Sequence, residues 1–106
     1  MAVLYVTIVI ALGNPGVVLA QENASVHTVI ISDFKFTPEV LTVNPGDTVI
    51  WINQDIVPHT ATATDKSWDT GFIGSNESNE MVIKHSQTLS YYCLYHPNMT
   101  ATLALE

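Results

Sequence analysis

Residues 40–53 read VLTVNPGDTVIWIN and contain two short apolar segments on either side of a turn. β-Branched and aromatic residues favour strands, while the Asn-Pro-Gly-Asp sequence at 44–47 combines residues that turns prefer. The sequence therefore predicts a strand at Val40–Val43, a turn, and a second strand at Thr48–Asn53. This pattern is typical of a fold in which the strands are short and the connections are tight.

The same pattern continues along most of the chain. Strands are also predicted at Val26–Ile31, His59–Thr64, Met81–Lys84, Gln87–Cys93 and Met99–Leu105, with a polar loop at Gly74–Glu80. No segment has the spacing of an amphipathic helix, and no internal repeat is found. Regular short strands with frequent turns predict an all-β fold, an antiparallel β-sandwich or barrel, in one domain over residues 21–106.

Residues 1–20 differ from the rest because they carry no charged side chain, and Ala2–Leu12 is an apolar run. This run is too short to span a bilayer alone, and Ala20 offers the small residue of a cleavage site. The sequence favours a cleaved signal peptide over 1–20. The alternatives are an uncleaved anchor that associates the protein with a membrane, and an internal strand or a truncated start. Both the cleaved signal peptide and the uncleaved anchor would place the domain in the periplasm or on the extracellular face of the membrane.

The charge of the chain restricts its partners. Three lysines, no arginine and ten acidic residues give a formal net charge of −7. Phosphate binding needs clustered cations, so the charge disfavours nucleic acid and anionic membrane surfaces as partners. The acidic balance promotes solubility, and it would also accelerate encounter with a cationic redox partner.

Metal-binding side chains are concentrated near the C-terminus. Cys93, His96 and Met99 follow one another at i, i+3 and i+6, and upstream His59 follows Pro58. A thiolate, two imidazoles and a weak thioether form the donor set of a blue-copper electron-transfer site. Because Cys93 is the only cysteine, an internal disulfide is excluded. We therefore predict that these four side chains hold one type 1 copper ion, which alternates between Cu(I) and Cu(II).

The strand pattern indicates how these side chains could meet. His59, Cys93 and Met99 lie on the apolar faces of predicted strands, at strand ends. His96 lies in the middle of the loop and is predicted to be the ligand nearest the surface. His27 has no metal-binding neighbour in its strand, and His85 lies in a polar turn, so neither is predicted to bind metal.

At this point the sequence resembles the cupredoxins, and specifically the amicyanin and plastocyanin group, over roughly residues 26–105. The stretches that carry the resemblance are Phe36-Thr37-Pro38, Val43–Val49, Trp51-Ile52-Asn53, Pro58-His59-Thr60, Asp69-Thr70-Gly71, Tyr91-Tyr92-Cys93 and His96-Pro97-Asn98-Met99-Thr100. The short loop from Cys93 to Met99 is more similar to amicyanins than to plant plastocyanins. Asn98 departs from the family pattern, in which a large aromatic residue is common.

The resemblance implies a Greek-key antiparallel β-sandwich, a type 1 copper ion, and electron transfer between larger redox proteins. It also implies that Asn53 braces the site by a hydrogen bond in or near the loop that follows Cys93. The expected partners are a donor dehydrogenase or an acceptor cytochrome or oxidase. The expected contact patch surrounds His96 and includes Val57, Pro58 and Pro97.

The sequence predicts a monomeric electron carrier and not an enzyme, with no small-molecule substrate. A multicopper oxidase or a nitrite reductase would need further histidine pairs, and a binuclear copper centre would need a second cysteine. The alternative function is an extracytoplasmic copper carrier or chaperone that uses the same four side chains without an electron-transfer partner.

Overall fold

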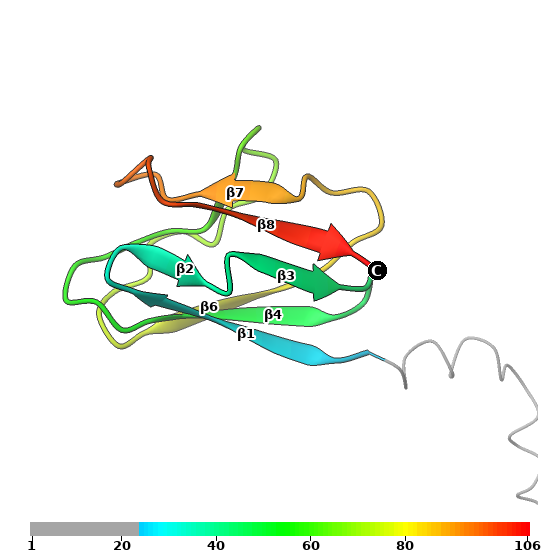
Figure 1. Cartoon of the computed structure of the whole chain (residues 1–106), viewed down its shortest axis with the longest axis horizontal. Coiled ribbons are helices and arrows are strands. Elements are labelled where there is room, and N and C mark those ends of the chain that lie inside the picture. Colours follow the sequence, from blue (N-terminus) through cyan, green and yellow to red (C-terminus); the bar gives the residue numbers. More distant parts are fainter. Residues whose placement is uncertain (1–23) are drawn as a thin grey trace, which may run out of the picture.

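Two four-stranded sheets pack face to face in the computed structural model, which describes residues 24–106 (Figure 1). One sheet has the order β2-β1-β4-β6 and the other has the order β3-β8-β7-β5. The strands are β1 (Val26–Ser32), β2 (Lys35–Thr37), β3 (Val40–Val43), β4 (Thr48–Asn53), β5 (Thr62–Ala63), β6 (Ser78–Val82), β7 (Ser90–Tyr92) and β8 (Thr100–Leu105). The predicted all-β sandwich in a single domain is confirmed. The predictions for residues 1–20 lie outside the described residues, and within 24–106 no helix is long and apolar enough to cross a membrane.

The pairing within each sheet is mixed, whereas the expectation was antiparallel. β1 pairs with β4 in parallel and β3 pairs with β8 in parallel, while the β1–β2, β4–β6, β5–β7 and β7–β8 pairs are antiparallel. The cause is the two-residue link between β2 and β3, at residues 38–39, where the chain passes from one sheet to the other. After that crossing, β4 returns to the first sheet beside β1 and runs in the same direction.

The core lies between the sheets, and alternate residues of each strand face it, as strand geometry requires. Its buried members include Val29 and Ile31 from β1, Val49 and Trp51 from β4, and Tyr91 and Leu103 from β7 and β8. The rings of Trp51 and Tyr91 meet edge to face at 5.6 Å. Full burial of a large apolar side chain stabilises the fold by about 1.5–3 kcal/mol.

The segment predicted as a strand at His59–Thr64 is regular only at β5, over two residues. Its backbone amides are used by side chains of other segments: the amide of Thr60 donates to Cys93 Sγ, and the amide of Ala61 donates to Thr70 Oγ1. All residues from His59 to Ala63 are buried, so the expected separation into an inner and an outer face is not seen. The segment therefore belongs to the site more than to the sheet.

The segment predicted as a polar loop at Gly74–Glu80 ends in a strand, because β6 begins at Ser78 and ends at Val82. β6 is the last strand of its sheet and pairs only with β4, so its residues are exposed or half-buried. An edge strand tolerates polar side chains that a central strand would exclude. The strand predicted at Met81–Lys84 therefore lies too far toward the C-terminus compared with β6.

Candidate metal centre

The predicted site lies at one end of the sandwich, where β7 ends and β8 begins. In Figure 1 this is the left-hand end, opposite the C-terminus, where the orange loop 93–99 and the green loop 54–61 both lie. Cys93 immediately follows β7 and Met99 immediately precedes β8. The sandwich therefore fixes both ends of the loop and leaves His96 between them.

Backbone hydrogen bonds between the candidate ligands close this loop. The amide of His96 donates to the carbonyl of Cys93 at 3.3 Å, and the amide of Met99 donates to the carbonyl of His96 at 2.9 Å. The amide of Cys93 donates in turn to the carbonyl of Met99 at 3.1 Å. These three bonds hold the i, i+3, i+6 residues in one tight turn, and Pro97 fixes a backbone angle within it.

Three donor atoms converge at the centre of the site. Cys93 Sγ lies 3.6 Å from His59 Nδ1 and 3.7 Å from His96 Nδ1, and all three atoms lie within 4.8 Å of one another. His59 and Cys93 are fully buried and His96 is half-buried. Among residues 24–106 this is the only group of three or more histidine, cysteine or acidic side chains placed to hold a metal. A soft sulfur with two imidazole nitrogens suits copper in both oxidation states.

Met99 completes the predicted set. Its side chain is 5 % exposed and packs in the core cluster with Cys93. It also lines a surface hollow together with His96. The structure thus places all four predicted residues at one end of the sandwich, and it places His96 nearest the surface.

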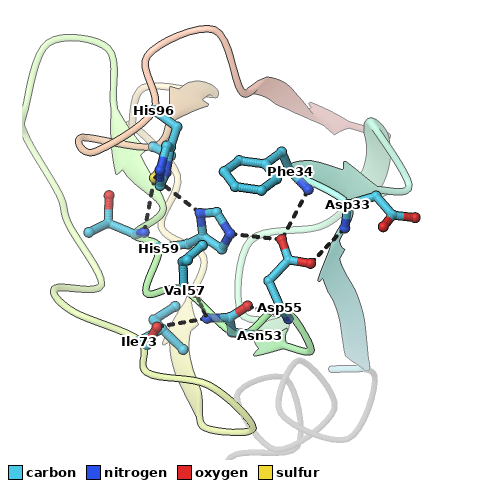
Figure 2. A network of polar contacts seen from close by, with 10 residues as sticks. Asp33, Phe34, Asn53, Asp55, Val57, His59, Ile73 and His96 are labelled. Carbon is cyan, nitrogen blue, oxygen red and sulfur yellow. Dashed lines mark hydrogen bonds and ion pairs between the residues drawn. The ribbon is translucent and has the colours of Figure 1, made fainter.

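His59 has a carboxylate partner that sequence reasoning missed. The Nε2 atom of His59 lies 2.8 Å from Asp55 Oδ2, on the side of the ring away from Cys93 (Figure 2). Histidines that bind metal commonly donate the remaining ring N–H to a carboxylate, which fixes their orientation. An acidic residue four positions before a histidine is too common a pattern to identify this role from sequence.

Asp55 is held by more than His59. Its carboxylate accepts the backbone amides of Asp33 at 2.7 Å and of Phe34 at 3.0 Å. Burial alone would raise the pKa of this carboxyl, but the hydrogen bonds from Phe34, His59 and Asp33 favour the charged form and lower the pKa overall. A carboxylate is therefore maintained beside His59.

The resemblance placed a hydrogen bond of Asn53 in or near the loop after Cys93. In the structure Asn53 bonds to the segment before His59 instead. Its amide group donates to the carbonyls of Val57 at 2.9 Å and Ile73 at 3.0 Å, and its Oδ1 accepts the amide of Asp55 at 2.9 Å (Figure 2). The expected bracing of the site is found, but it acts on the segment before His59, because that segment directly follows the end of β4. Asn53 instead fixes the chain that carries Asp55 and His59.

The contact with the cysteine loop is made by Thr60. Its hydroxyl accepts the amide of Leu94 at 2.9 Å, and its own amide donates to Cys93 Sγ at 3.4 Å. These two contacts hold the cysteine loop and its sulfur against the residue that follows His59. Sequence reasoning missed this role because Thr60 reads as an ordinary strand residue.

Phe34 is a further residue that the sequence did not indicate. Its ring meets the ring of His96 at 4.8 Å and that of His59 at 5.3 Å, edge to face in both cases. It is 48 % exposed. The imidazole of His96 is therefore partly covered by an aromatic ring from the turn between β1 and β2.

The apolar surface around His96 is larger than the contact patch that the sequence predicted. Val57 and Pro58 are half-buried and Pro97 is exposed, as a surface patch requires. Several large apolar side chains are also exposed in the loops at this end: Phe34, Ile56, Phe72, Leu94 and Tyr95. Phe72 and Tyr95 contact each other across two loops, with ring centres 6.4 Å apart.

The other two histidines lie outside the site. His27 has an acidic partner that the sequence did not indicate, since its Nε2 lies 2.8 Å from Asp47 Oδ2. This pair is not part of the cluster of three. His85 is exposed in a turn.

The fold and the site together define a copper protein of the cupredoxin class. Residues 23–106 match the family of copper binding proteins described as the plastocyanin/azurin family, and the chain belongs to that family. Its predicted copper cofactor and its membership of the blue-copper class are thereby confirmed. No curated protein sequence matches the chain significantly.

Solved structures show the same fold. A methionine-to-alanine variant of amicyanin in its Cu(I) form is 26% identical, with a TM-score of 0.68 over 76% of this chain and 82% of that one. A purple cupredoxin from Nitrosopumilus maritimus is 21% identical, with a TM-score of 0.66 over 76% of this chain and 99% of that one. A copper-containing nitrite reductase from Thermus scotoductus is 23% identical, with a TM-score of 0.65 over 74% of this chain but only 22% of that one. The likeness to the reductase is therefore a likeness to part of an enzyme.

Proposed function

We propose that the chain is a mobile carrier of single electrons, in which one copper ion is held by His59, Cys93, His96 and Met99. The observation that carries this proposal is the convergence of Cys93 Sγ with the two Nδ1 atoms within 4.8 Å, at the end of a rigid sandwich. Copper would supply the one-electron Cu(I)/Cu(II) couple. The protein side chains supply a donor set that accepts both oxidation states.

The restraints on the ligands support rapid electron transfer. His59 is fixed by Asp55, and the loop from Cys93 to Met99 is closed by its own backbone hydrogen bonds. Because these side chains are restrained, they would rearrange little when the charge of the metal changes. A small rearrangement of the ligands is what fast exchange of one electron requires.

The partners that we propose are larger redox proteins, a donor dehydrogenase or an acceptor cytochrome or oxidase. The imidazole of His96 is less buried than that of His59, so we assign the exchange of electrons to this end of the sandwich. The exposed apolar side chains there would form the centre of a transient contact. The net charge of −7 favours a partner with a cationic surface, because opposite charge accelerates encounter.

We also propose that the carrier is a monomer outside the cytoplasm, exported by a cleaved segment at 1–20, and that it is not an enzyme. Support for the last point is that residues 24–106 contain one metal-binding cluster, whereas copper enzymes with several centres need more ligands. A copper carrier or chaperone would use the same donor atoms. Reversible reduction and fast exchange of electrons distinguish the two functions.

The test is an optical and redox titration of the protein loaded with Cu(II). We expect a strong visible band, a reversible one-electron potential, and fast self-exchange measured by broadening of proton NMR lines in mixtures of Cu(I) and Cu(II) protein. Colourless binding would contradict the ligand assignment. A blue protein with slow self-exchange that passes copper to an acceptor would favour the carrier or chaperone.

A further inference from the structure

The turn between β1 and β2 has an unusual conformation for its sequence. Asp33 and Phe34 both have positive φ angles, of 54° and 59°. Two-residue hairpin turns of this kind prefer glycine at the second position, and a bulky residue there is strained. Strained backbone that persists at a site suggests that the residue has a role there.

Asp55 holds this turn in place. Its carboxylate accepts the amides of Asp33 and Phe34, and the same carboxylate contacts His59 Nε2 (Figure 2). The three contacts fix the position of Phe34 relative to His59. The ring of Phe34 is directed toward the two imidazoles and not away from the protein.

Phe34 also lines two hollows in the surface. One, of about 430 Å³, is lined by Phe34, His96 and Met99 among others. The other, of about 320 Å³, is lined by Phe34, Met99 and Asn98 among others. Water and small solutes can enter both hollows. His96 lines the larger one, and the ring of Phe34 lies edge to face against the imidazoles of His59 and His96.

We propose that Phe34 is a shield, held by Asp55, that keeps water and small anions away from the donor atoms of His59 and His96. The part of this proposal that concerns copper rests on the proposed function. A small anion such as azide is an external ligand for Cu(II), and it competes where the metal can be reached. Excluding such ligands would leave the metal to the protein side chains alone.

The first test uses the copper-loaded protein and azide as the probe. Phe34→Gly removes the ring, and it places glycine after Asp33, which is the pair that this turn prefers. Phe72→Ala is the control, because Phe72 is an exposed aromatic at the same end that contacts Tyr95 and neither imidazole. We expect azide to change the optical and EPR spectra of Phe34→Gly at concentrations that leave the wild type and Phe72→Ala unchanged. An equal response of all three proteins would overturn the proposal.

The second test needs no copper. In the metal-free protein, a soluble paramagnetic gadolinium chelate relaxes ring protons in proportion to their exposure. Phe34→Gly should show a severalfold larger relaxation at the His96 ring than the wild type, while Phe34→Leu should remain close to the wild type. Unchanged relaxation in Phe34→Gly, with its hairpin amides protected from exchange, would overturn the shield. Because this measurement is independent of the metal, failure of the copper assignment would leave it intact.

Discussion

The hydroxyl of Thr60 accepts the backbone amide of Leu94 at 2.9 Å, which joins the two segments that supply the site. Thr60 immediately follows His59, and Leu94 immediately follows Cys93. The bond therefore ties together the two segments that carry His59 and Cys93, which are 34 residues apart in the chain. It restrains the sulfur and the buried imidazole relative to each other without involving the metal.

Thr60→Val should lower the free energy of unfolding of the metal-free protein by about 1–2 kcal/mol, because the amide of Leu94 loses its acceptor while the shape of the side chain is kept. Urea unfolding measures this. Thr28→Val, at an exposed position of β1, is the control and should change the stability by less than about 0.5 kcal/mol. Equal stabilities of the two variants would mean that the bond contributes nothing.

Cys93→Ser should abolish the strong visible band of the Cu(II) protein, because the band arises from charge transfer between thiolate and copper. The fold should survive, since serine is close in size to cysteine, and far-UV circular dichroism would record an unchanged β spectrum. A variant that remained intensely blue would exclude Cys93 as the sulfur donor.

Met99→Leu should keep the visible band and raise the reduction potential, because loss of a weak donor disfavours Cu(II) more than Cu(I). Leucine conserves the volume of the buried side chain, so the fold should tolerate it. Cyclic voltammetry gives the potential. An unchanged value would assign Met99 to the core alone.

Pro97→Glu should slow electron self-exchange while leaving the spectrum nearly unchanged, because it places a charge in the apolar surface beside His96. Val82→Glu is the matched control: Val82 is 52% exposed, but it pairs with the first residue of β4, far from the site. Proton NMR line broadening measures both rates. If both variants slowed equally, the effect would come from net charge and not from a contact at this end.

Acid should destabilise the fold partly through Asp47, at the other end of β1. Burial would raise the pKa of this carboxyl from its ordinary value of 3.8, but hydrogen bonds from the amides of Ser25 and Asn44 and from His27 lower it overall. A lowered folded-state pKa gives stability that is present above the unfolded value and is lost as the pH falls through the folded one. Asp47→Asn should therefore lose less stability than the wild type between about pH 5 and pH 2, measured by urea unfolding. Parallel pH profiles of the two proteins would contradict this.

Where the signal was local, the sequence identified residues that the structure brings together. Cys93, His96 and Met99 lie within one loop, so their spacing alone indicated a common site, and two of these side chains join His59 in the observed cluster. The bounds of β3 and β4 were also predicted correctly, because a strong turn separates two β-branched segments.

Features that depend on which segments become neighbours were not predicted. Asp55, Thr60 and Phe34 act through contacts with residues far along the chain or through the geometry of a turn, and no local pattern distinguishes them. The parallel pairing of β1 with β4 was missed for the same reason. Alternation identifies the buried face of a strand, but it does not identify the strand beside it.

The closed loop from Cys93 to Met99 has a consequence for how such proteins diversify. Its three backbone hydrogen bonds are internal, and the rest of the protein holds it at the two strand ends and through Thr60. Replacements between these ends can change the surroundings of the metal without refolding the sandwich beneath it. Selection can then adjust redox properties and architecture as nearly separate traits.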